Sequence, residues 1–143
     1  MASEIWAWSI DRQLASTFAA VQATAMELLG YLDSAGWSKH DRHAVHLALE
    51  ESLVNAIKHG NQRDAAKSIH FRGDVSRNRV RIEIADEGTG FNPAAVPDPT
   101  VDANLVRPTG RGVMLIRRFM TRVEYLGRGN RLVMEKERTP PVG

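Results

Sequence analysis

The first residues that could do chemistry are a glutamate and an asparagine four positions apart, in Glu51-Ser-Leu-Val-Asn55. On a helix this spacing places both side chains on one face. A carboxylate and an amide directed toward water or a pocket can serve acid–base chemistry and metal binding, although an isolated pair of this kind is more often a solvated helix face. At about 100° per residue, the nearby apolar residues fall on the opposite side of the helix: Val45, Leu49, Leu53 and Ala56.

A second candidate, Asp86-Glu-Gly88-Thr-Gly90, stands where a predicted strand ends. Asp and Gly are common in turns, so one explanation is a plain turn after an edge strand. The other is a site for a flat ligand, in which the carboxylate accepts a hydrogen bond and the two glycines let the ligand approach the backbone. The segment alone favours neither explanation.

A third candidate, Gly110-Arg111-Gly112, opens a predicted helix. A helix N-terminus offers unpaired N–H groups and the positive end of the helix dipole, and glycines let phosphate oxygens come close to both. Arg111 is near enough to meet the same phosphate, whereas Thr109 is equally suited to be an ordinary N-cap. The Walker A pattern, the dinucleotide fingerprint and the protein-kinase signatures are absent from the sequence.

Metal chemistry based on other residues has little support. His40, His43 and His46 recur every third residue on one predicted helix, and the first and last of them point too far apart to converge on one ion. The sequence has no cysteine, which excludes disulfides, thiolate catalysis and cysteine zinc sites.

Hydrophobic periodicity predicts one strand and two helices in the first half of the chain, before the second and third motifs. A strand is expected over residues 5–10. A helix whose apolar stripe runs from Leu14, through Phe18, to Leu32 is expected to stop at Gly36. A second helix is expected from Ser38, with Asp41 in a capping-box-like position, to about residue 59.

The second half of the chain predicts two hairpins, over residues 69–84 and 123–137, with a helix to about Met120 between them. Residues 92–109 hold four of the six prolines and no periodicity, which is typical of a lid or of a disordered segment. The resulting order β, α, α, ββ, loop, α, ββ predicts an α+β two-layer sandwich, with helices on one face of a mixed, mostly antiparallel sheet.

Composition limits the broad class of protein. A length of 143 residues, with 43% hydrophobic and 25% charged residues, fits one globular domain over residues 1–143. No signal peptide and no long apolar run are visible, so we expect a cytoplasmic protein without a membrane segment. Nineteen basic residues against seventeen acidic ones leave a net charge of only +2, which gives nucleic-acid binding little support.

Together and in this order, the three motifs resemble those of the GHKL (Bergerat-fold) ATPase superfamily. The resemblance is greatest to its small stand-alone members, the anti-sigma-factor serine/threonine kinases, whose ATP-binding domain is histidine-kinase-like. It extends from the first strand to the last hairpin and is carried by Glu51-Ser-Leu-Val-Asn55-Ala-Ile-Lys-His59-Gly60-Asn61, Asp86-Glu-Gly-Thr-Gly-Phe91-Asn-Pro93 and Arg107-Pro-Thr-Gly-Arg-Gly-Val-Met-Leu-Ile.

The resemblance implies that ATP and Mg²⁺ bind here and gives each motif a role. Glu51 would be the general base, and Asn55 would hold Mg²⁺ through its amide oxygen. Asp86 would accept a hydrogen bond from the adenine amino group, with Gly88 and Gly90 beside the base and sugar.

The third motif would cradle the phosphates through Gly110, Gly112 and neighbouring amides, with Thr109 and Arg111 close by and residues 92–109 closing as a lid.

The implied activity is phosphorylation of a serine or threonine on a small anti-sigma-antagonist protein. A sigma factor and a second copy of the chain are further implied partners, whereas nucleic acid and membrane are not. Two alternatives stay open. An ATP-gated module could sequester its partner with little or no phosphotransfer, and a basic nucleic-acid binder would ignore ATP and weaken steeply with salt.

Overall fold

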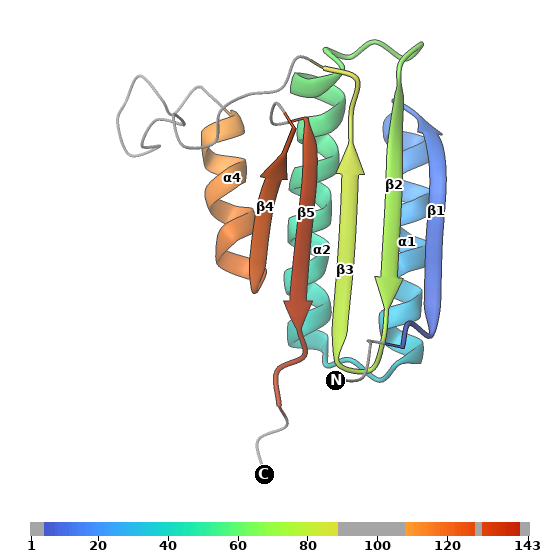
Figure 1. Cartoon of the computed structure of the whole chain (residues 1–143), viewed down its shortest axis with the longest axis vertical. Helices are drawn as coiled ribbons and strands as arrows, with labels where there is room; N and C mark the ends of the chain where they lie inside the picture. The colour runs from blue at the N-terminus through green and yellow to red at the C-terminus, as the bar shows by residue number, and fades with distance from the viewer. Residues whose placement is uncertain (1–4, 89–107, 128–129, 141–143) are drawn as a thin grey trace.

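The structure is a computed structural model that describes residues 5–88, 108–127 and 130–140, with the backbone alone described over 108–113. The elements follow the predicted order (Figure 1). They are β1 (Trp8–Ala15), α1 (Phe18–Ser34), α2 (Lys39–Asn55), the π-helical turn η1 (Ala56–Gly60), β2 (Ser68–Val75), β3 (Arg79–Ala85), α4 (Pro108–Phe119), β4 (Arg122–Leu126) and β5 (Arg131–Glu137).

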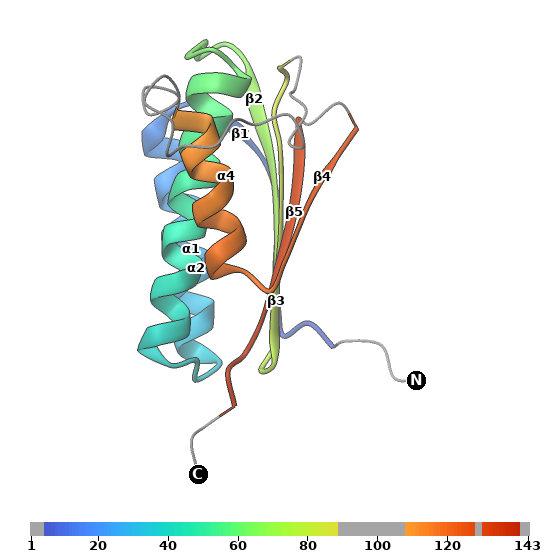
Figure 2. The same cartoon turned by 90° about the vertical axis from the view of Figure 1, so that its left-hand side faces the viewer.

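The five strands form one sheet in the order β1-β2-β3-β5-β4. Figure 2 shows the three α-helices together on one face of this sheet. The predicted two-layer α+β sandwich is therefore confirmed. Within the described ranges, every neighbouring pair of strands is antiparallel, so the sheet is not mixed there.

The core lies between the sheet and the helices. Alternate residues of β2 and β3 face the helices, among them Phe71 and Ile82, which are fully buried. The apolar stripe predicted for α2 packs against them, with Val45 and Leu49 fully buried and Leu53 and Ala56 nearly so. This packing fixes the rotation of α2 about its axis.

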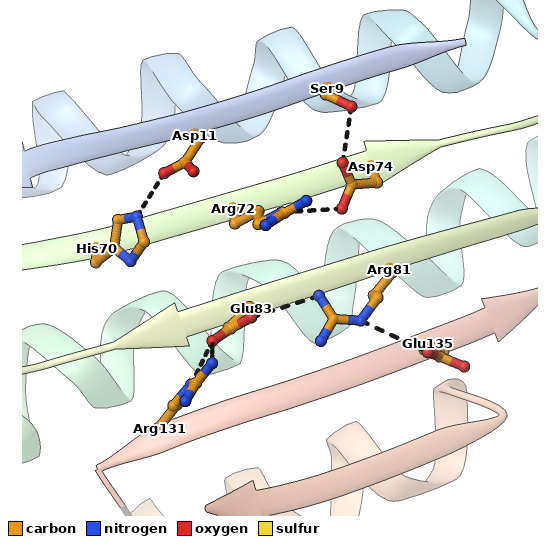
Figure 3. Close-up of polar contacts among 9 residues, drawn as sticks. All are labelled: Ser9, Asp11, His70, Arg72, Asp74, Arg81, Glu83, Arg131 and Glu135. Carbon is orange, nitrogen blue, oxygen red and sulfur yellow. Dashed lines mark hydrogen bonds and ion pairs between the residues drawn. The ribbon is translucent and has the colours of Figure 1, made fainter. Parts of the chain in front are cut away.

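The opposite face of the sheet carries polar side chains (Figure 3). Glu83 lies in a row of ion pairs with Arg81 and Arg131. Between β1 and β2, Ser9 Oγ donates a hydrogen bond to the Asp74 carboxylate at 2.7 Å. A sheet with one apolar and one polar face is what the alternation in β2 and β3 predicts.

The first strand and helix begin later than predicted. Leu14, taken as the start of the helical stripe, lies in β1 and pairs with Ile69. β1 ends at Ala15, and Thr17 starts α1 as its N-cap, with its side chain accepting a hydrogen bond from the Ala20 N–H at 3.3 Å. Phe18 then becomes the first helical residue and is 46% exposed rather than part of the stripe.

The ends of the first two helices follow the predicted signals. Gly36 follows α1 with a φ of +78°, the left-handed conformation that favours glycine. Ser38 caps α2 by accepting a hydrogen bond from the Asp41 N–H at 3.1 Å. The Asp41 carboxylate does not complete the capping box, since it accepts hydrogen bonds from the backbone and hydroxyl of Thr139.

The helix over the third motif also begins earlier than predicted. α4 starts at Pro108, so Thr109 is its second residue and the N-cap explanation for Thr109 is wrong. Proline suits this first position because its φ is already helical and its missing N–H would have had no partner there. The predicted lid therefore ends before Pro108, and its residues 92–107 lie outside the described residues, as does Gly90.

No helix within the described ranges is long and apolar enough to cross a membrane.

Candidate functional site

Glu51 and Asn55 lie one turn apart near the end of α2, and both are half-buried. The buried stripe of α2 holds the opposite side of the helix in the core, which leaves these two side chains directed away from it. A carboxylate and an amide are thus presented together by a helix that cannot rotate without exposing its core residues.

The amide oxygen of Asn55 is buried and has no hydrogen-bond partner among the described residues. Such a group costs about 1–3 kcal/mol compared with a paired one, so proteins seldom leave one without a reason. An amide oxygen is also a ligand that suits a hard cation such as Mg²⁺. Asn55 is therefore a fitting magnesium ligand.

Gly60, at the end of η1, brings the second motif against the first. A Cβ on Gly60 would lie 2.2 Å from Oδ2 of Asp86, and a Cβ on Gly88 would lie 2.2 Å from the carbonyl oxygen of Gly60. Neither position has room for a side chain. The helical segment that carries Glu51 and Asn55 therefore ends in direct contact with the Asp86–Gly88 segment.

The carboxylate of Asp86 is held in a partly desolvated position. Burial raises its pKa above the ordinary value of 3.8, while the Gly88 N–H and the charge of Lys67 act in the opposite direction. The Gly88 N–H donates to Asp86 Oδ1 at 2.8 Å. Oδ2 has no such bond among the described contacts, so Asp86 retains an acceptor for a ligand.

The π-helical turn η1 carries two basic residues directly after Asn55. Lys58 Nζ lies 6.0 Å from the centroid of the Phe18 ring, at the start of α1. Burial lowers the pKa of His59, and the charges of Lys58 and Arg63 lower it further. His59 therefore favours its neutral form, whereas Lys58 supplies positive charge beside the site.

The third motif is carried by α4, which runs alongside α2 in both views (Figures 1 and 2). The start of α4 lies at the same end of the molecule as η1. Gly110 is in the first turn of the helix, where N–H groups lack intrahelical partners. Gly112 lies four residues after Pro108, so its N–H belongs to the helical hydrogen-bond pattern. The side chains of Thr109 and Arg111 lie outside the described residues.

Sequence reasoning missed three residues that hold these segments together: Gly60, Asn61 and Asn130. Gly60 and Asn61 close the first stretch that carries the family resemblance, but the sequence gives them no role of their own, and Asn130 lies outside all three motifs. Their contacts join positions far apart in the chain, and no local pattern in the sequence reports such contacts.

The histidine alternative does not form a metal centre. Among the described residues, no group of three or more His, Cys, Asp or Glu side chains is placed to hold a metal ion.

The chain is similar in sequence to known protein kinases. Serine/threonine-protein kinase BtrW of Bordetella bronchiseptica is 29% identical over 108 residues, which cover 73% of this chain and 76% of BtrW. Serine-protein kinase RsbW of Listeria innocua is 26% identical over 121 residues, or 78% of this chain and 75% of RsbW. RsbW of Staphylococcus epidermidis is 25% identical over 121 residues, with 80% and 76% covered.

A family model described as the histidine kinase-like ATPase domain matches residues 14–136, which include all three motifs. The resemblance predicted from those motifs is confirmed, and the chain belongs to the histidine kinase-like ATPase domain family.

Proposed function

We propose that this protein is an ATP- and Mg²⁺-dependent protein kinase that transfers the γ-phosphoryl group to a serine or threonine of a small partner protein. One observation carries the proposal: the buried amide oxygen of Asn55, one helical turn after Glu51, has no hydrogen-bond partner among the residues that the structure describes. The names of the relatives BtrW and RsbW, both protein kinases, support the same activity.

Binding of ATP would use the contact between the first two motifs. The Asp86 carboxylate would accept a hydrogen bond from the adenine amino group, and the close approach of Gly60 and Gly88 holds that carboxylate in place. Gly90 would lie near the base and sugar. The phosphates would lie toward the start of α4, where the backbone N–H groups of Thr109 and Gly110 lack intrahelical partners, with Arg111 and Gly112 in the same turn of the helix.

Asn55 would hold the Mg²⁺ ion, which neutralises charge that develops on the phosphates. The carboxylate of Glu51 would accept the proton of the partner's hydroxyl as its oxygen attacks the γ-phosphorus and ADP leaves. The half-buried setting of Glu51 supports this role, because a general base needs access to the incoming hydroxyl.

For the partner we propose a small anti-sigma-antagonist protein, with a sigma factor and a second copy of the chain as further partners, in the cytoplasm. These proposals follow from the resemblance to the small stand-alone kinases. Residues 92–107 would close over bound ATP as a lid.

The test is transfer of ³²P from ATP to proteins of the host lysate, with the wild type, Glu51→Ala, Glu50→Ala and Asp86→Asn. Glu51→Ala should bind ATP but label no partner, whereas Asp86→Asn should lose ATP binding. Glu50→Ala is the matched control, because Glu50 is exposed and precedes the motif. ATP binding without any labelling by the wild type would instead favour the module that sequesters its partner.

A further inference from the structure

The peptide group that joins Asp86 to Glu87 is held at both of its polar ends by side-chain amides. Asn130 Nδ2 donates to the carbonyl oxygen of Asp86 at 3.1 Å. The Glu87 N–H donates to Asn61 Oδ1 at 2.8 Å. The two asparagines come from opposite sides, since Asn61 follows η1 and Asn130 precedes β5.

Asn61 is itself held so firmly that its amide cannot turn. The residue is fully buried, and its Nδ2 donates to Ser16 Oγ at 3.1 Å and to the Ser68 carbonyl oxygen at 3.0 Å. With both N–H groups used, Oδ1 must face the Glu87 N–H. Through these hydrogen bonds Asn61 connects the residues before α1, the start of β2 and the segment that follows Asp86.

Asn130 supplies the other restraint through two bonds. Besides the bond from its side chain, its backbone carbonyl oxygen accepts from the Asp86 N–H at 3.0 Å. The orientation of the Asp86 backbone is therefore fixed on both sides. That backbone determines where the carboxylate points, and sites for ligands tolerate displacements of only about 0.5 Å.

We propose that Asn61 and Asn130 are positioning residues for base recognition: they set the selectivity for adenine by orienting the Asp86–Glu87 peptide, without touching the nucleotide. The proposal rests on the proposed function, in which Asp86 accepts the adenine amino group.

The test compares two nucleotides, ATP and purine riboside triphosphate, which lacks the amino group. Dissociation constants are measured with Mg²⁺ by calorimetry, at a temperature where circular dichroism shows each protein fully folded. The variants are Asn61→Ala and Asn130→Ala. Asn78→Ala is the matched control, since Asn78 is an exposed residue of the β2–β3 turn at the other end of the sheet.

The wild type and Asn78→Ala should prefer ATP. In the two test variants the affinity for ATP should fall about tenfold, the loss expected for one misplaced hydrogen bond, while the affinity for the analogue changes less than about twofold. In an Asp86→Ala background, Asn130→Ala should change neither constant. If Asn61→Ala does not fold, Asn130→Ala decides the question, because Asn130 is only half-buried at a turn.

A merely structural role would lower the melting temperature and leave the preference for ATP unchanged, and that result would overturn the proposal while the proposed function stands. A wild type that binds ATP and the analogue equally would contradict the role of Asp86, and this proposal with it.

Discussion

The carboxylate of Asp86 lies against the backbone of Gly60, so closely that a Cβ on Gly60 would stand 2.2 Å from Asp86 Oδ2. The two residues are separated by two strands in the sequence. Their contact joins the helix of the first motif to the acid of the second. The proposed base-binding and magnesium-binding residues therefore lie on segments that are in direct contact.

This contact predicts that Gly60→Ala impairs ATP binding more than folding. The new methyl group meets Oδ2 and Cγ of Asp86, which are side-chain atoms, so the carboxylate must turn away from its present position, and the fold loses less stability than it would in a clash with backbone. ATP affinity should then fall about tenfold or more, as for loss of one charged hydrogen bond. Calorimetry with ATP and thermal melting of the same samples measure the two effects.

Substitutions of two other glycines serve as comparisons for this prediction, with opposite expected effects on stability. In Gly88→Ala the methyl group meets the Gly60 carbonyl oxygen, a backbone atom, so the free energy of unfolding should fall by about 1–3 kcal/mol. In Gly30→Ala, in α1, the methyl group meets nothing within 4 Å, so the free energy of unfolding should rise by about 0.5–1 kcal/mol. Gly60→Ala with unchanged ATP affinity would show that Asp86 does not need its present position.

Asn55→Ala should separate function from stability. The substitution removes a buried amide oxygen that has no partner among the described residues, and alanine favours helix. The free energy of unfolding of the apoprotein should stay within about 1 kcal/mol of the wild type or rise, while Mg²⁺-dependent ATP binding is lost. Urea denaturation and calorimetry check the two parts.

Asn61→Ala is the contrasting variant, because Asn61 makes hydrogen bonds with both ends of its amide. It should lower the free energy of unfolding by about 1–3 kcal/mol, since it leaves buried groups unpaired. A larger loss of stability in Asn55→Ala than in Asn61→Ala would contradict the assignment of Asn55 to a ligand.

Asp86→Asn should stabilise the apoprotein at neutral pH. Burial raises the pKa of Asp86 in the folded state, so the ionised carboxylate costs stability, and this cost grows as the pH rises from 3.8 through the raised pKa. Asparagine removes the cost. The stability difference between variant and wild type should therefore shrink as the pH falls and become independent of pH below 3.8.

Urea denaturation of both proteins over a pH series measures this difference. If the variant is less stable than the wild type at neutral pH, the folded protein stabilises the ionised Asp86 carboxylate, which contradicts a pKa raised by burial.

Much of this fold could be predicted, because periodicity and caps are local. Ser38 and Gly36 mark helix ends through hydrogen bonds and dihedral angles within a few residues, and the alternation in β2 and β3 directly reports which face is covered. The start of α1 was misplaced because Leu14 fits a helical stripe and a strand equally well. Its pairing with Ile69, distant in the sequence, decides between them.

The candidate site was predictable as three motifs but not as an arrangement. Glu51, Asn55 and Asp86 stand out by type and spacing. Asn61 and Asn130 do not, because an asparagine beside a glycine is typical of any turn. Their importance comes from partly buried hydrogen bonds across 26 and 44 residues of sequence.

The most direct test of the account is calorimetric titration of ATP into the wild-type protein, with Mg²⁺ and again with excess EDTA, beside Asn55→Ala under both conditions. We predict saturable binding of one ATP per chain with Mg²⁺, much weaker binding in EDTA, and no effect of Mg²⁺ on Asn55→Ala. Absence of ATP binding by the wild type, or equal enhancement by Mg²⁺ in both proteins, would contradict the account.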